Sequence, residues 1–185
     1  VAVGEIGLDF YRNLSPPDAQ REAMARQLEL AARFSKPVII HDRDAHDEVS
    51  ATLMAWPGPG REPKGILHCF SGDAGMARTL ARAGFLVSFA LPVTFSSARG
   101  PRDAVMQLAG DQILVETDAP WLAPGGAANR NEPTTALRVA AEFLRQVARV
   151  RDRLDQLGGR RGQLRHQLDQ LLFQHRSEPL DRRRA

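Results

Sequence analysis

The chain has 185 residues, of which 43% are hydrophobic, and its formal net charge is +3. This length suits one domain with a real core and is too short for two of ordinary size, and the composition excludes a disordered chain. No apolar stretch approaches the roughly 18 residues that a membrane span requires. The first residues, Val1–Glu5, have the pattern of neither a signal peptide nor a transit peptide.

The single cysteine and the distribution of charge narrow the function classes further. Cys69 alone cannot form an internal disulfide, which indicates a reducing, cytoplasmic setting, and we expect it to be a packing residue. Residues 1–144 carry a net charge of −3, whereas residues 145–185 carry +6. Because the basic charge lies in the tail, global charge does not support nucleic-acid binding, and such a function must be argued from the site.

Five apolar runs of about four to eight residues recur along the chain. They are Val1–Leu8, Pro37–His41, Gly65–His68, Phe85–Ala90 and Gln112–Thr117. Continuous apolar runs of this length are typical of strands that are buried on both faces. Helical patterns separate the runs through short connections, which indicates parallel βαβ units.

Helix signals fill the first three intervals between these runs. Ser15 is suited to cap a helix that has Pro16 at its first position. Asp73 is suited to cap a third helix, which ends at Gly84. Apolar residues recur at helical spacing in the three intervals: Met24, Leu28, Ala31, Val49, Leu53, Trp56, Met76 and Leu80.

Two further helices are predicted in the second half of the chain. One extends from Pro101 to Leu108 and ends before Gly110. A longer one follows Pro133, and three apolar residues fall on one of its faces: Leu137, Ala141 and Leu144. Parallel strands alternating with helices in this way predict an α/β fold.

Imidazoles and carboxylates occur where four of the five runs end, at Glu5, His41, His68 and Asp118. The carboxyl ends of parallel strands meet at one edge, where α/β barrels build their active sites. Each residue alone is more often a structural histidine, a cap or a turn residue. Together they match the ligands that Zn²⁺, Mn²⁺ or Mg²⁺ prefer, and two carboxylates buried together without a cation would be costly. The set therefore predicts a metal site.

The segments that carry these side chains resemble the motifs of the TatD deoxyribonuclease family. The segments are Gly4–Asp9 with Tyr11-Arg12, Gln20–Glu22, His41–Ala45, His68–Gly72, Glu116–Leu122 and Arg130–Pro133. They occur in the family's order between residue 1 and about residue 149. The resemblance implies a TIM-type (β/α) barrel of the amidohydrolase-like kind, and a metal-dependent phosphodiesterase that acts on DNA.

The resemblance also implies residue roles. Glu5 is expected to be the carboxylate that bridges two metal ions, and His41 and His68 to bind the second ion. Asp118 is expected to bind the first ion and to orient the attacking water, which makes Asp118 and Glu5 the catalytic residues. Two divalent ions (Zn, Mn or Mg) polarise a phosphoryl group, lower the pKa of a bridging water and stabilise the leaving oxygen. The substrate contacts that the resemblance implies are Arg43, Phe70 and Arg130.

The chain also departs from the family pattern. The five histidines are His41, His46, His68, His166 and His175, so the family's His-x-His pair, at the end of its first strand, has no counterpart. The five runs resemble strands four to eight of a barrel that normally needs about 250 residues. We therefore expect an N-terminally truncated, incomplete barrel over residues 1–149, an atypical Arg-rich tail over residues 150–185, and an exposed His46. Gly125–Asn129 replaces a basic stretch of the family.

Three functions stay open at this point. The first is a TatD-like deoxyribonuclease, impaired in this form. The second is a non-catalytic barrel fragment that keeps a residual metal site from Glu5, His41 and His68. The third is a hydrolase of the same superfamily that acts on another ester or on an amide, which substrate tests would separate from the first.

Overall fold

The five predicted strands form one parallel sheet. A computed structural model describes residues 1–124, 130–142 and 145 of the chain. The sheet has the order β1-β2-β3-β4-β5, and each neighbouring pair is parallel. The strands are β1 (Val3–Asp9), β2 (Val38–Arg43), β3 (Gly65–Leu67), β4 (Phe85–Phe89) and β5 (Ile113–Val115). The prediction of an α/β fold with five parallel strands is confirmed.

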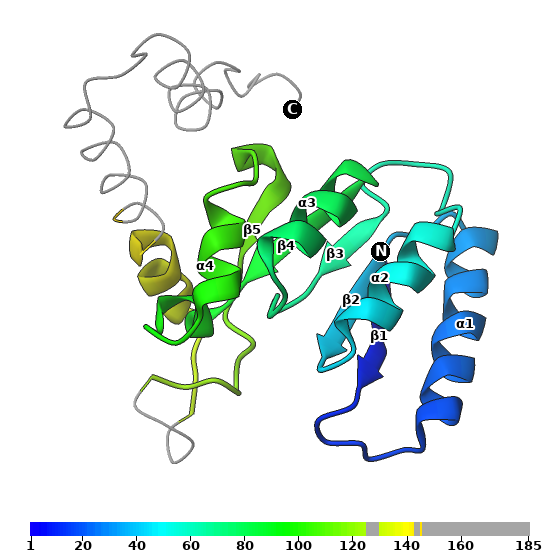
Figure 1. Ribbon diagram of the computed structural model, residues 1–185, viewed down its shortest axis with the longest axis horizontal. Helices are drawn as coiled ribbons and strands as arrows, with labels where there is room; N and C mark the ends of the chain where they lie inside the picture. Colours follow the sequence, from blue (N-terminus) through cyan, green and yellow to red (C-terminus); the bar gives the residue numbers. More distant parts are fainter. Residues whose placement is uncertain (125–129, 143–144, 146–185) are drawn as a thin grey trace, which may run out of the picture.

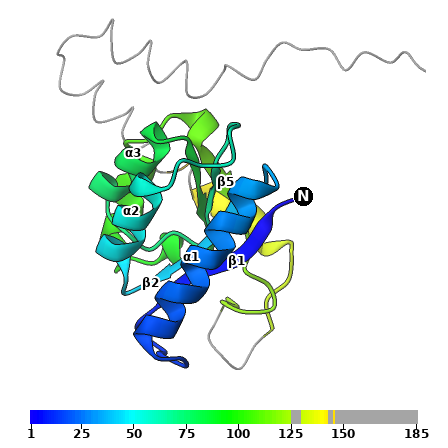
Figure 2. The same cartoon turned by 90° about the vertical axis from the view of Figure 1, so that its right-hand side faces the viewer.

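A helix follows each of the first four strands. These helices are α1 (Pro17–Arg33), α2 (His46–Ala55), α3 (Ala74–Arg82) and α4 (Arg99–Val105), and two short 3-10 helices are η1 (Leu91–Thr94) and η2 (Gly110–Gln112). Figure 1 shows the strands side by side in chain order, and in Figure 2 helices α2 and α3 lie together on one side of the sheet. No helix in the described part of the chain is both long and apolar enough to cross a membrane.

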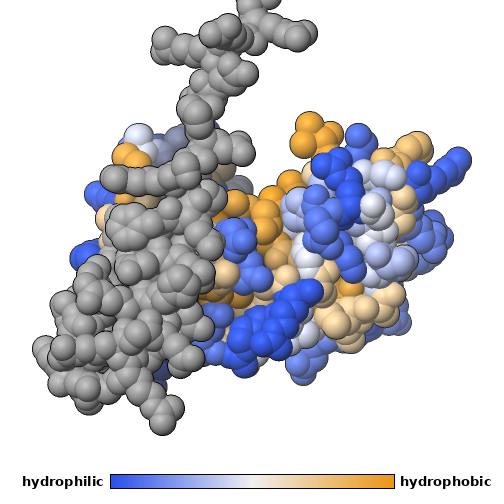
Figure 3. Space-filling view, turned by 90° about the horizontal axis from the view of Figure 1, so that it is seen from above, coloured by the Kyte–Doolittle hydropathy of each residue, from blue (hydrophilic) through white to orange (hydrophobic). Residues whose placement is uncertain are grey.

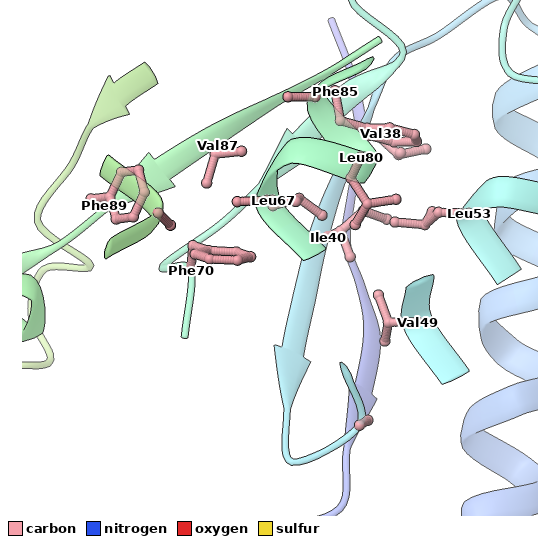
Figure 4. Close-up of a cluster of buried hydrophobic side chains, with 14 of the residues drawn as sticks. Val38, Ile40, Val49, Leu53, Leu67, Phe70, Leu80, Phe85, Val87 and Phe89 are labelled. Carbon is pink, nitrogen blue, oxygen red and sulfur yellow. The ribbon is translucent and has the colours of Figure 1, made fainter. Parts of the chain in front are cut away.

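The core lies between the helices and one face of the sheet. Ile40 and Leu67 lie beside Leu53 and Leu80 of the helices (Figure 4), and Val87 pairs with Leu67 on the next strand. All five side chains are buried. Full burial of an aliphatic side chain stabilises the fold by about 1.5–3 kcal/mol. The helical stripes read from the sequence are largely confirmed by the burial of these residues: Met24, Leu28, Ala31, Val49, Leu53, Trp56 and Leu80.

The other face of the sheet is less covered. Ile39, Ile66, Leu86 and Leu114 alternate with the core residues along their strands and are only half-buried within the described structure. The prediction that the strands are buried on both faces therefore does not hold for the described residues. Figure 3, which looks at the molecule from above, shows hydrophobic side chains between two areas of hydrophilic ones.

The helix ends follow the predicted caps in one case and not in another. Asp73 accepts a hydrogen bond from the Met76 N–H at 2.8 Å, and Gly84 follows α3 with a φ of 96°, as predicted. The predicted cap at Ser15 is wrong, because α1 begins at Pro17 and has no side-chain cap. Instead, the Ser15 carbonyl accepts a hydrogen bond from Gln20 Nε2 at 2.8 Å, so a residue inside the helix satisfies the entering loop.

The predicted buried face of the last helix is also wrong. Residues 135–142 are helical, but Leu137 is 74% exposed and Ala141 is exposed, whereas Val139 and Glu142 are buried. The buried carboxylate of Glu142 is paired with two arginines: Arg145 Nη2 lies 2.5 Å from it, and Arg102 Nη2 of α4 lies 3.7 Å from it. Leu144 and the predicted tail, residues 150–185, lie outside the described residues. Helix α4 also begins earlier than predicted, at Arg99.

Gly7 sets the distance between the first two strands at the point where they approach the site. It pairs with His41, and a Cβ on Gly7 would lie 1.8 Å from the His41 carbonyl oxygen. Its φ of +150° is also a conformation that side chains rarely adopt. We therefore expect Gly7→Ala to lower the free energy of unfolding by about 3 kcal/mol or more in urea titrations.

Gly60→Ala is the matched control for this substitution. Gly60 also has a positive φ, of +71°, but nothing lies within 4 Å of its added Cβ. It should cost about 1 kcal/mol, which is the backbone penalty alone. Equal losses for the two variants would show that the close contact at His41 is not a constraint.

The two outer strands have open edges in the described structure. Strands β1 and β5 each pair with one neighbour there, and Val115 of β5 is 38% exposed. An open apolar edge is a template for pairing with another chain. We expect the chain to self-associate and Val115→Lys to reduce this in light scattering, because an edge charge opposes pairing. A wild-type chain that is monomeric at the same concentrations would contradict the prediction.

Candidate active site

The four residues predicted as metal ligands lie in one cavity at the carboxyl ends of the strands. Glu5 comes from β1, His41 from β2, His68 from the turn after β3, and Asp118 from the loop after β5. All four line a cavity of about 1150 Å³. The strand-end argument thus brings together side chains that lie up to 113 positions apart in the sequence.

His41 lies between two carboxylates. Its Nδ1 is 2.9 Å from Glu5 Oε1, and its Nε2 is 3.3 Å from Asp9 Oδ2. Burial works against the charge of Asp9, but hydrogen bonds from the Arg12 N–H and from His41 outweigh it and lower the pKa of Asp9. The sequence prediction did not include Asp9. This residue is the last of β1, the strand that also carries Glu5. It is a fifth donor at the site.

His68 is held by a carboxylate that the sequence prediction missed. Its Nδ1 lies 2.5 Å from Glu116 Oε2, while the other oxygen of Glu116 accepts the Cys69 N–H at 2.7 Å. The hydrogen bond with Glu116 raises the pKa of His68. Burial alone would raise the pKa of Glu116, but its hydrogen bonds with His68, Ser88 and the Cys69 N–H lower it. A histidine held by a carboxylate through one nitrogen presents the other nitrogen in a fixed direction.

The second nitrogen of His68 points toward the remaining two carboxylates. His68 Nε2 lies 3.3 Å from Asp118 Oδ1 and 3.8 Å from Glu5 Oε1. Glu116 directly follows β5, and its contact with His68 joins this strand end to the turn after β3. Glu116 is thus a positioning residue for His68 by its contacts.

Asp118 is the carboxylate of the site whose pKa is raised. Burial raises its pKa, the carboxylates of Glu116 and Glu5 raise it further, and His68 partly offsets them. The loop that bears Asp118 is fixed by Asn131, whose Nδ2 donates to the Thr117 carbonyl at 2.6 Å. Like charges held together by the fold in this way favour a bound cation, which lowers the energy of every ionised carboxylate around it.

The side chains of the site are of the chemical types that bind a divalent metal. In this structure, however, they contact one another and are not arranged around a metal position. Imidazole nitrogens and carboxylate oxygens are the ligands that Zn²⁺ and Mn²⁺ prefer, and carboxylates suit Mg²⁺. As the side chains stand, no group of three or more His, Cys, Asp or Glu among the described residues is arranged to hold a metal ion. Glu5 Oε1 contacts both His41 and His68, so the same atoms would have to exchange these contacts for a metal.

The predicted substrate contacts are only partly in the cavity. Arg43 lines it, with its guanidinium 4.2 Å from the centre of the Tyr11 ring. Phe70 also lines it, but its ring is largely buried and packs edge-on against Phe89 at 5.8 Å. Arg130 is exposed and is not among the residues that line the cavity.

His46 and Cys69 also line the cavity. His46, expected to be exposed, is half-buried, because its Nδ1 pairs with Asp42 Oδ2 at 2.8 Å. Burial raises the pKa of Cys69 to about 12, with the neighbouring carboxylates adding to the shift. A thiol that stays protonated at neutral pH is a poor nucleophile, in keeping with its expected role in packing.

The contact between His68 and Glu116 should make stability depend on pH. The pKa of His68 is raised above 6.5, so its contribution is complete below that pH and is lost as the pH rises through the folded-state pKa. The pKa of Glu116 is lowered below 4.5, so its contribution is complete above that pH and is lost on acidification. We expect Glu116→Gln to lower stability most between about pH 4.5 and 6.5, measured by urea unfolding in EDTA.

The pKa of His68, followed by NMR, provides the control for this prediction. It should fall toward 6.5 in Glu116→Gln, because the amide keeps an acceptor oxygen and loses the charge. A stability difference that is the same at every pH, together with an unchanged His68 pKa, would contradict the pairing.

Comparisons with known proteins agree with this geometry. The family model described as TatD related DNase matches residues 1–156. The chain is 40% identical over 144 residues to the uncharacterized metal-dependent hydrolase YabD of Bacillus subtilis, covering 77% of this chain and 56% of that protein. It is 38% identical over 158 residues to the 3'-5' ssDNA/RNA exonuclease TatD of Pectobacterium carotovorum, covering 82% of this chain and 58% of the relative.

A solved structure gives the same result. The crystal structure of YJJV, a TatD homolog from Escherichia coli K12, superposes with a TM-score of 0.71 at 33% identity, over 79% of this chain and 56% of that one. The match confirms the TIM-barrel type of the fold. The chain spans a little over half the length of these relatives. The family match covers most of the chain: the chain belongs to the TatD related DNase family.

Proposed function

We propose that the chain is the site-bearing part of a metal-dependent phosphodiesterase that cleaves single-stranded nucleic acid. The observation that carries this proposal is the convergence of Glu5, His41, His68 and Asp118 in one cavity, with the carboxylates close enough to disfavour each other's charge. The names of the relatives support a divalent metal and, in one case, a single-stranded DNA or RNA substrate. DNA was the substrate expected from the sequence.

The residues would divide the work as follows. Glu5, His41, His68 and Asp118 would hold the metal, and Glu116 keeps His68 turned toward it. When bound, a divalent ion supplies charge that stabilises a phosphoryl group under attack. Asp118 is suited to orient the attacking water and to accept its proton, because its carboxylate lines the cavity beside His68, with Oδ1 3.3 Å from His68 Nε2.

The cationic side of the cavity suits a phosphate. Arg43 ends strand β2, Arg12 follows strand β1, and both line the same cavity as the metal-binding candidates. An arginine guanidinium matches the oxygens of a phosphate through paired N–H groups. The Arg43 guanidinium lies over the Tyr11 ring, with its central carbon 4.2 Å from the ring centre, which favours this position of the side chain. Arg43 therefore remains the proposed phosphate contact.

Asp118→Asn is the direct test of the proposal. The amide keeps the shape but is a weak metal ligand and a poor proton acceptor, so we expect metal-dependent cleavage of a labelled single-stranded oligonucleotide to fall by about 10²–10⁴-fold. Asp111→Asn, an exposed aspartate of η2 outside the cavity, is the matched control and should retain activity. Titration calorimetry with Mn²⁺ should show weaker binding to the Asp118 variant only.

The results also separate the alternatives. Metal binding by the wild-type chain without cleavage of nucleic acid, esters or amides would indicate a non-catalytic barrel fragment. Cleavage of an ester or amide but not of oligonucleotides would indicate another hydrolase of the superfamily. Unchanged cleavage and unchanged Mn²⁺ binding in Asp118→Asn would show that the wrong residue has been assigned.

A further inference from the structure

One aromatic side chain of the cavity has no structural role that its contacts explain. Trp121 is 68% exposed, yet it lines the cavity that contains Asp118. Trp56, in contrast, is buried against the core and donates its Nε1–H to the Leu28 carbonyl at 3.1 Å. A large exposed aromatic beside a cavity exposes apolar area to water that a ligand could cover.

The backbone of Trp121 is held firmly although its side chain is free of burial. Its N–H donates to the Asp118 carbonyl at 2.8 Å, so the two residues belong to one turn. The buried Asn131 closes the turn, because its backbone N–H donates to the Pro120 carbonyl at 3.0 Å and its side chain donates to the Thr117 carbonyl. The turn therefore holds the backbone of Trp121 close to that of Asp118, the carboxylate that the proposed function assigns to the reaction.

The surroundings match the chemistry of one ligand class. Trp121 follows β5, the last strand of the sheet, whereas Arg12 follows β1 and Arg43 ends β2, at the other end of the strand order. All three line one cavity, and His68, which follows β3, lies between them in the strand order. Flat aromatic faces and arginines that bind phosphate are the two elements with which proteins bind single-stranded nucleic acid.

We propose that Trp121 is a stacking platform for an unpaired nucleobase of the substrate, beside the phosphodiester that lies at Asp118. The proposal rests on the proposed function for the identity of the substrate. Every base has a π-face, so the platform should select for an unpaired base and not for its identity. In a duplex both faces of a base are covered by its neighbours, so stacking on Trp121 would first require extrusion of the base.

The test compares intact and abasic ligands in the absence of turnover. A short, labelled single-stranded oligodeoxynucleotide and the same oligomer with abasic residues are bound to the full chain in Ca²⁺, and affinity is read from anisotropy. We expect the intact oligomer to bind about tenfold more tightly and to quench tryptophan emission. Trp121→Ala should bring this ratio close to one and abolish the quenching, and Trp121→Phe should retain part of the ratio.

Phe34→Ala is the matched control. Phe34 is also an exposed aromatic, at 60%, but it follows α1 and does not line the cavity. Its loss should leave the ratio of intact to abasic binding unchanged. An unchanged ratio in Trp121→Ala, equal binding of the two oligomers by the wild type, or no binding at all would overturn the proposal.

Cleavage assays of the same oligomers in Mn²⁺ separate this inference from the proposed function. Base-dependent binding with quenching but without cleavage would sustain the stacking role and count against the phosphodiesterase. Cleavage that is equally fast for intact and abasic oligomers, and insensitive to Trp121→Ala, would sustain the phosphodiesterase and overturn the stacking role.

Discussion

Repulsion among carboxylates at one end of a parallel sheet is the constraint on which the rest of the site depends. Glu5, Asp9, Glu116 and Asp118 are held around two imidazoles by strand ends whose positions are fixed by the core behind them. The fold cannot separate them without giving up buried apolar contacts. Protons on the histidines or a bound cation would relieve this repulsion. The pKa of Asp118 is raised first by burial and then by the carboxylates of Glu116 and Glu5, and His68 offsets only part of the shift.

The two histidines answer this constraint differently. Both nitrogens of His41 face carboxylates, Glu5 and Asp9, at 2.9 and 3.3 Å. His68 is anchored more strongly at one side, since its contact with Glu116 is shorter than its contact with Asp118. When one nitrogen of an imidazole is anchored, a metal can replace the proton on the other nitrogen without a change in the orientation of the ring. His68 is therefore the better-prepared ligand, and His41 must give up a carboxylate contact to bind.

Much of the fold and of the site could be predicted from the sequence, because both depend on short-range patterns. Apolar runs locate the strands, and the polar residue at the end of each run locates the site, since parallel strands share one carboxyl edge. Glu116 and Asp9 were missed because their roles are contacts across strands, which spacing does not encode. The face of the helix at 135–142 was mispredicted because apolar spacing does not show that Glu142 is buried between two arginines, Arg145 beside it and Arg102 forty positions earlier.

The loop after β5 shows how one local arrangement serves several purposes. Asn131 donates hydrogen bonds to the Thr117 and Pro120 carbonyls, and the same turn carries Asp118 and Trp121, which both line the cavity. Because Asp118 has a φ of 55°, its conformation costs energy that the turn must offset. Asp118 thus combines an unfavourable backbone conformation with an unfavourable electrostatic environment, and an exposed indole lies beside it in the same turn. Such an arrangement favours ligand binding over stability. The sheet is the rigid support, and the loop after β5 carries side chains of the site.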